Sequence, residues 1–157
     1  MSFIAVIPAR FGSTRLPGKP LLEIAGQPMI QHVYARALSS RAERVIVATD
    51  YQRIDDVVKG FGGECLMTAP DHPTGTDRLA EVADILGLAA EAIIVNVQGD
   101  EPLLPASAIR QVADMLVTHP EASIATLCEP IHGLSDIEDP NQVKVVKSRS
   151  GRALYFS

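Results

Sequence analysis

Residues 92–97, Ala-Ile-Ile-Val-Asn-Val, form a near-continuous apolar run, and the polar turn Gln-Gly-Asp-Glu-Pro follows at residues 98–102. A short run of this composition is typical of a strand buried on both faces of a parallel sheet, so we expect a central strand here. Other runs rich in β-branched and apolar residues predict strands at residues 3–7, 44–48, 64–67, 123–127 and 143–146, with another beginning at 153–156.

Segments with apolar residues at helical spacing lie between these runs. They predict helices at residues 28–38, 52–61, 76–86 and 106–117. The alternation of short strands with helices predicts an α/β fold with a mostly parallel central sheet flanked by helices. Because such sheets bind ligands beyond the carboxyl ends of their strands, the polar residues that follow each strand are the candidates for a site.

Length, charge and cysteine content limit the classes of protein. The 157 residues can bury a core of ordinary size, and the composition is ordinary for a globular protein, so we expect a single domain over residues 1–157. A net charge of −5 argues against broad attraction to nucleic acid or to an anionic membrane. Cys65 and Cys128 are far apart within apolar runs, which favours buried reduced thiols over a disulfide or a metal site.

The two ends of the sequence carry separate predictions. Residues 3–7 lack the basic start and the length of a signal peptide or a membrane span, which predicts a cytoplasmic protein. The sequence stops at Leu154-Tyr155-Phe156-Ser157, inside a strand-like run with no turn or polar tail. This ending predicts a truncated domain that lacks its C-terminal portion.

A basic loop directly follows the first expected strand. Arg10, Arg15 and Lys19 place three cations within ten positions of an otherwise acidic protein, beside the hydroxyls of Ser13 and Thr14. Glycines and prolines allow the loop to fold back, so that these groups and backbone N–H groups can face the phosphates of a nucleotide. The loop fits neither the Walker A pattern nor the Gly-x-Gly-x-x-Gly fingerprint, which disfavours an ATPase or a dehydrogenase. The alternative is a solvated basic loop.

The acidic turn at residues 98–102 is expected at the same edge of the sheet. Asp100 is a candidate ligand of Mg²⁺, which commonly takes one or two carboxylates together with phosphate oxygens. Gln98 offers both a donor and an acceptor to a sugar hydroxyl or a carboxylate, and the alternative is that it only stabilises the turn. Glu101 is either an outer ligand or solvated. A tight turn without a ligand is the alternative for Gly99-Asp100.

A third polar segment, residues 71–78, precedes the helix predicted at 76–86. Thr76 can cap that helix, and this role of the segment needs no ligand. Thr74 and the backbone near Gly75 offer hydrogen bonds that suit recognition of a base. Arg78 falls in the first helical turn, where the helix dipole disfavours a cation, and this position indicates another partner for its side chain.

The remaining histidines do not indicate a catalytic site. His32, His119 and His132 are expected to be packed or solvated. The sequence has no Ser-His-Asp order, no His-Glu-x-x-His segment and no paired-cysteine motif, which argues against hydrolytic triads and zinc catalysis.

Five motifs in a fixed order carry a resemblance that covers the whole chain. They are Ile-Pro-Ala-Arg (7–10), Leu-Pro-Gly-Lys-Pro-Leu (16–21), Val-Ala-Thr-Asp (47–50), Thr-Gly-Thr-Asp-Arg-Leu-Ala-Glu (74–81) and Val-Asn-Val-Gln-Gly-Asp-Glu-Pro (95–102). Together they closely resemble the 3-deoxy-manno-octulosonate (KDO) cytidylyltransferases, also called CMP-KDO synthetases. The resemblance implies a Rossmann-like nucleotidyltransferase fold and the Mg²⁺-dependent conversion of CTP and KDO to CMP-KDO and pyrophosphate for lipopolysaccharide biosynthesis.

The resemblance also implies roles for matching residues and a homodimeric assembly. The residues expected to hold the nucleotide and its phosphates are Arg10, Ser13, Arg15 and Lys19, with weaker assignments at Thr74, Gly75 and Arg78. Asp100 would bind Mg²⁺, and Gln98 would face KDO. The catalytic residues would be Lys19, Arg10 and Asp100.

Two other functions remain open at this point. A related CMP-sialic acid synthetase shares the opening of the fold, although the Val-Gln-Gly-Asp-Glu-Pro segment and the Ser-Thr-Arg of the basic loop favour KDO. The second alternative is a nucleotide-binding fragment without catalytic activity. It follows because members of the family continue beyond the matching part, with another Mg²⁺ carboxylate, KDO contacts and dimer surface.

Overall fold

The computed structural model describes residues 2–12 and 16–157. Its contacts divide the chain into two compact units, Met1–Ala125 and Thr126–Ser157. One domain over residues 1–157 stays a prediction, because a folding domain can contain more than one compact unit. The larger unit contains every predicted site residue that the structure describes.

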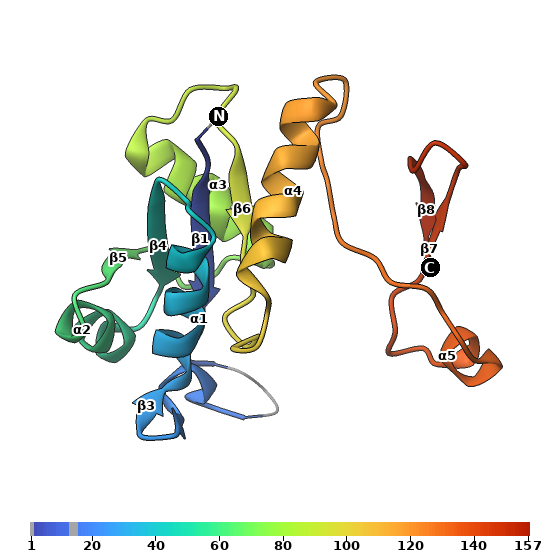
Figure 1. The fold of residues 1–157 in the computed structure, drawn as a ribbon. Coiled ribbons are helices and arrows are strands. Elements are labelled where there is room, and N and C mark those ends of the chain that lie inside the picture. Colours follow the sequence, from blue (N-terminus) through green and yellow to red (C-terminus); the bar gives the residue numbers. More distant parts are fainter. Residues whose placement is uncertain (1, 13–15) are drawn as a thin grey trace. The chain divides into compact units, whose positions relative to one another are not determined.

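A four-stranded parallel sheet lies at the centre of the larger unit (Figure 1). Its strand order is β5 (Glu64–Met67), β4 (Arg44–Thr49), β1 (Ile4–Ala9) and β6 (Ile94–Asn96). Val6 of β1 lies opposite Ile46 of β4 on one side and opposite Asn96 of β6 on the other. The predicted α/β fold with a parallel sheet is confirmed.

The strand β6 differs from its prediction. The apolar run at residues 92–97 predicts a central strand, but β6 has three residues and lies at the edge of the described sheet, so the central position is wrong. The central positions belong to β1 and β4, and residues 45–49 of β4 are all buried. In β6, Val95 is buried whereas Ile94 is half-buried and Asn96 is exposed, as expected where a strand has a neighbour on one side.

Helices cover both faces of the sheet. The long helices of this unit are α1 (Met29–Ser39), α2 (Gln52–Gly60), α3 (Gly75–Leu86) and α4 (Ala106–Thr118). Helices α1, α2 and α4 share one core with Ala5 and Ile7 of β1, whereas α3 packs against Val6 on the opposite face. This alternation follows from the two-residue period of a strand. The four predicted helices are confirmed, with ends within one residue of those expected.

The short elements of the larger unit were not predicted from the sequence. A tight hairpin joins β2 (Glu23–Ile24) to β3 (Gln27–Pro28), and a single 3-10 turn, η1, covers Lys19–Leu21. Elements of two or three residues are too short to show a strand or helix period. Among the described residues, no helix combines the length and the apolar character needed to cross a membrane.

The smaller unit consists of a helical turn and an antiparallel hairpin. The turn is α5 (Leu134–Glu138), and the hairpin pairs β7 (Val145–Lys147) with β8 (Ala153–Phe156). The strand predicted at residues 123–127 is wrong. This segment spans the boundary between the two units, pairs with no strand in the described structure and leaves Ile124 84% exposed. A β-branched run becomes a strand only where an edge is available to receive its backbone hydrogen bonds.

The two cysteines differ in environment. Cys65 lies buried in β5, as predicted, but Cys128 is exposed, so the prediction of a buried thiol is wrong for that residue. Burial together with the neighbouring Asp55 carboxylate raises the pKa of the Cys65 thiol to about 12. The folded state therefore favours the protonated thiol, and this stabilisation is complete below pH 9.0 and is lost as the pH rises toward about 12.

We expect a thiol reagent at pH 8 to modify Cys128 rapidly and Cys65 slowly in the folded chain, because the thiolate is the reactive form and Cys65 is both buried and protonated. Peptide mass spectrometry after timed labelling would measure the two rates. In denaturant both thiols should react at similar rates. Equal rates in the folded chain would contradict the burial of Cys65.

Candidate functional site

Three segments converge at the carboxyl ends of β1 and β6. They are the end of β1 at Pro8, the turn at Gly99 and the start of α3 at Gly75. A Cβ atom at Gly99 would lie 2.8 Å from the carbonyl oxygen of Pro8, and one at Gly75 would lie 3.4 Å from the Pro8 ring. The absence of side chains at both glycines therefore permits the close approach of these segments.

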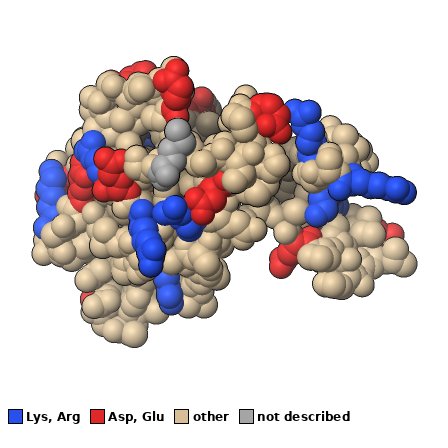
Figure 2. Space-filling view, turned by 45° about the horizontal axis from the view of Figure 1, so that its top comes forward, with Lys and Arg blue, Asp and Glu red and all other residues tan. Residues whose placement is uncertain are grey.

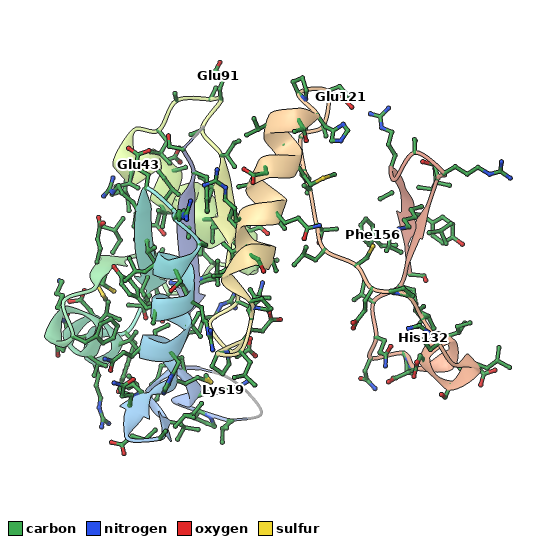
Figure 3. All side chains as sticks on the ribbon, viewed as in Figure 1. Lys19, Glu43, Glu91, Glu121, His132 and Phe156 are labelled. Carbon is green, nitrogen blue, oxygen red and sulfur yellow. The ribbon has the colours of Figure 1, made fainter. Side chains whose placement is uncertain are left out.

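An ion pair joins the basic loop to the acidic turn. Lys19 Nζ lies 2.7 Å from Asp100 Oδ2, although the two residues are 81 positions apart in the sequence. Their side chains are 35% and 52% exposed, so both charges remain accessible to a ligand. Figure 3 labels Lys19 at the end of the larger unit where the loop after β1 turns back, and Figure 2 shows Lys and Arg side chains next to Asp and Glu side chains on the visible face.

The position of Lys19 depends on the local fold of the loop. Gly18 has a φ of 71°, which glycine adopts without strain, and its N–H donates to the carbonyl oxygen of Phe11 at 3.0 Å. The Phe11 ring stacks on Tyr51, which follows β4, with ring centroids 4.0 Å apart. These contacts hold both ends of the loop near the sheet edge and present Lys19 at the first position of η1.

The other predicted residues of these two segments lie as follows. Arg10 is half-buried directly after β1, and Gln98 is exposed on the turn after β6. Ser13 and Arg15 lie outside the described residues, so their assignments stay predictions. The structure thus brings Lys19 and Asp100 into contact and places Arg10 and Gln98 at the same strand ends.

Helix α3 begins with a capping box, and the predicted cap is wrong. The capping residue is Thr74, not Thr76: its hydroxyl accepts a hydrogen bond from the Asp77 N–H at 3.2 Å, and the Asp77 carboxylate accepts from the Thr74 N–H at 3.0 Å. Thr74 has extended backbone angles, whereas Thr76 already lies within the helix. Donation from the Thr74 hydroxyl holds the pKa of Asp77 below its ordinary value. A nucleotide contact by Thr74 or Gly75 stays a prediction.

The position of Arg78 predicts a partner for its side chain, and the structure shows that other residues of the protein fill this role. The side chain is fully buried, donates to Asp50 Oδ2 at 3.1 Å and also donates to the hydroxyl of Thr68. It therefore ties α3 to the ends of β4 and β5. A direct contact between Arg78 and a nucleotide stays a prediction.

Sequence reasoning overlooked a second anchor on α3. The Glu81 carboxylate accepts hydrogen bonds from the Ala69 N–H, at 2.9 Å for the nearer oxygen, and from His72 Nε2. These donors hold the pKa of Glu81 below its ordinary value. The spacing of three residues between Arg78 and Glu81 places both on one side of the helix and was the available signal.

The acidic turn fits part of a magnesium site. Among the described residues, no group of three or more His, Cys, Asp or Glu side chains is arranged to hold a metal ion. Mg²⁺ needs fewer protein ligands, because phosphate oxygens and water complete its octahedron. The exposed carboxylate of Asp100 fits such a role as one ligand. A cavity of about 390 Å³ lies elsewhere, between α1 and Pro102–Leu103, and none of the predicted site residues lines it.

We expect Gly99→Ala to destabilise the protein by about 1–3 kcal/mol and to weaken ligand binding at this edge, because the new methyl group would displace the turn from the Pro8 carbonyl and carry Asp100 with it. Chemical denaturation would measure the loss. Gly12→Ala is the control, since a Cβ atom there meets nothing within 4 Å. Equal stability of the two variants would contradict the close approach of Gly99.

Comparison with known proteins supplies the family. Residues 4–157 match the family model described as "Cytidylyltransferase". A 3-deoxy-manno-octulosonate cytidylyltransferase of Hahella chejuensis is 62% identical over 156 residues, which are 99% of this chain and 61% of that protein. The protein of the same name from Cellvibrio japonicus is 60% identical over the whole of this chain and 62% of its own length. The chain therefore spans about three fifths of these relatives.

Solved structures agree with this match. A CMP:2-keto-3-deoxy-manno-octonic acid synthetase complexed with CTP superposes with a TM-score of 0.91 at 46% identity, over all of this chain and 64% of that one. A cytidylyltransferase from Leptospira borgpetersenii, at 23% identity and a TM-score of 0.64, supports the fold alone. The Rossmann-like nucleotidyltransferase fold expected from the sequence is confirmed.

Proposed function

This chain belongs to the cytidylyltransferase family, and from that membership we propose that it forms the nucleotide-binding part of an enzyme that transfers CMP from CTP to KDO. The observation that carries the proposal is the ion pair of Lys19 with Asp100, which places a cation and a potential Mg²⁺ ligand at the edge where such sheets bind nucleotides. The 62% identity to a KDO cytidylyltransferase supports KDO as the sugar acid. A cytoplasmic location and a homodimeric assembly remain predictions.

The reaction is a displacement at phosphorus. The anomeric hydroxyl oxygen of KDO attacks the α-phosphorus of CTP, the new P–O bond forms as the bond to the β-phosphate bridging oxygen breaks, and pyrophosphate leaves with that oxygen. The hydroxyl proton passes to solvent. Lys19 and Arg10 would stabilise the negative charge on the transferring phosphate, and Gln98 would orient KDO.

Asp100 would hold Mg²⁺ in this enzyme, as an exposed carboxylate beside the basic loop. When bound, Mg²⁺ supplies charge neutralisation at the phosphate oxygens. The Lys19 ammonium, 2.7 Å from Asp100 Oδ2, would supply a second positive charge beside that site.

The direct test is pyrophosphate release with CTP, KDO and Mg²⁺. It would use the 157-residue chain and an extended protein, in which the remaining C-terminal part of the Hahella chejuensis relative follows residue 157. We expect the extended protein to release pyrophosphate only when KDO is present. Equal release with sialic acid would overturn the choice of sugar, and the absence of release with either sugar from a folded protein that binds CTP would overturn the proposed activity.

We expect Asp100→Asn to lower turnover of the extended protein by about 100-fold and to raise the Mg²⁺ concentration needed for half-maximal rate, because the amide loses the charge that binds the cation. Titration of the rate with Mg²⁺ would measure both effects. Glu91→Gln is the control, since Glu91 is an exposed carboxylate that precedes β6, whereas the acidic turn follows it. An unchanged Mg²⁺ requirement in Asp100→Asn would contradict the assigned role.

A further inference from the structure

The loop at residues 69–73 borders the proposed nucleotide site. It connects Thr68, which follows β5, to Thr74, the capping residue of α3. The next residue, Gly75, lies against Pro8 at the end of β1. The conformation of this loop therefore decides which backbone groups are presented at the edge where the basic loop and the acidic turn meet.

Glu81 attaches this loop to α3. Its carboxylate oxygens lie 2.9 and 3.2 Å from the Ala69 nitrogen, whose N–H donates to them, and one oxygen also contacts His72 Nε2. The loop is thus held at its first residue and near its far end by one side chain. Arg78, one helical turn earlier, holds the preceding Thr68 through its hydroxyl.

The surroundings of Glu81 argue against a role in overall stability alone. Its side chain is 29% exposed. Partly exposed pairs of this kind contribute little to the free energy of unfolding. A carboxylate that accepts two hydrogen bonds from a surface loop instead lowers the number of conformations available to that loop, which reduces the ordering cost of binding.

We propose that Glu81 is a positioning residue for the cytidine nucleotide: it holds residues 69–73 in the conformation that forms one wall of the nucleoside pocket, without contacting the ligand itself. The inference rests on the proposed function. Cytosine presents an amine donor and a carbonyl acceptor, which the N–H and C=O groups of an ordered loop can recognise. A loop released from Glu81 would present the same groups in many arrangements.

The test compares Glu81→Ala, Glu81→Gln and Asp84→Ala in the extended protein. Glutamine keeps an acceptor for the Ala69 N–H, and Asp84 is an exposed acid of the same helix, so its removal matches the change in charge. We expect Glu81→Ala to bind CTP about tenfold more weakly, as when the competent loop conformation is populated about a tenth of the time. Glu81→Gln and Asp84→Ala should remain within about threefold of the wild type.

Three further readouts separate positioning from general damage. Hydrogen exchange at the Ala69 amide should accelerate in Glu81→Ala, whereas calorimetric binding of inorganic tripolyphosphate, which lacks the nucleoside, should stay unchanged. In the turnover assay, KM for CTP should rise while kcat stays near the wild-type value.

The outcomes distinguish this inference from the proposed function. If the wild-type protein binds no CTP, both the proposed function and the positioning role of Glu81 are overturned. If it binds CTP and Glu81→Ala binds it equally well, only the positioning role is overturned. An equal loss of tripolyphosphate and CTP binding, or an Ala69 amide that stays fully protected in Glu81→Ala, would also overturn it.

Discussion

Replacing Lys19 by alanine is expected to lower the turnover of the extended protein by about 100- to 1,000-fold, the usual effect of removing one group that stabilises transition-state charge. Lys19 would contact the phosphates of CTP, and in the present structure its ammonium is 2.7 Å from the Asp100 carboxylate. The fold should be unaffected, because the side chain is 35% exposed and its ion pair lies at the surface. Steady-state kinetics and a thermal unfolding curve would measure the two quantities.

A matched control is available at the amino ends of the strands, away from the candidate site. Arg41 is an exposed cation just before β4, with a φ of 64° that glycine also adopts, so Arg41→Gly removes one positive charge without straining the backbone. This variant should keep wild-type kcat. Wild-type turnover by a folded Lys19→Ala protein would remove Lys19 from the mechanism.

The second large effect is expected on stability. Arg78→Ala should lower the free energy of unfolding by about 3 kcal/mol, near the lower end for breaking a buried ion pair, because Asp50 is 17% exposed and can regain some hydration. The loss has two sources: the hydrogen bonds to Asp50 and Thr68 disappear, and a fully buried side chain leaves a cavity. Urea denaturation of the 157-residue chain would measure the change.

A double-mutant cycle would assign that loss to its cause. If the ion pair dominates, Asp50→Asn and Arg78→Ala should be clearly non-additive, with a coupling energy of about 1–3 kcal/mol. Arg78→Lys should recover part of the stability, because one ammonium keeps the charge but does not reproduce the two-armed geometry of guanidinium. Additive losses would mean that packing, rather than the pair with Asp50, accounts for the burial of Arg78.

The helices and the parallel sheet were predictable because their signals are local and repeated. Each long helix carries apolar residues at a 3.6-residue period over several turns, and the ends of all four were expected within one residue. Residues 123–127 carry an equally local strand signal, yet they form no strand, because strand formation also requires a partner edge. The exposure of Cys128 has the same origin, since an apolar sequence neighbourhood does not guarantee packing.

The candidate site likewise has features that local sequence predicts and features that depend on tertiary contacts. The basic loop and the acidic turn were expected at one edge, because parallel strands end on the same side of a sheet, and the contact of Lys19 with Asp100 agrees with that expectation. The roles of residues on α3 were harder to predict from the sequence. Thr74 replaced Thr76 as the cap, and Glu81 was overlooked, because each depends on backbone angles or contacts that residue types do not specify.

The order of residues along the chain was thus enough to predict an α/β fold, the strand ends proposed to bind a nucleotide, and the motifs of a cytidylyltransferase. Tertiary packing alone decided that Arg78 is buried against Asp50, 28 residues away, and that Glu81 anchors the loop after β5. The physical reason is the distance along the sequence over which each kind of signal acts. Periodicity and turn chemistry act over a few residues, whereas the partner of a charged side chain is selected by desolvation and geometry among groups that only the folded chain brings together.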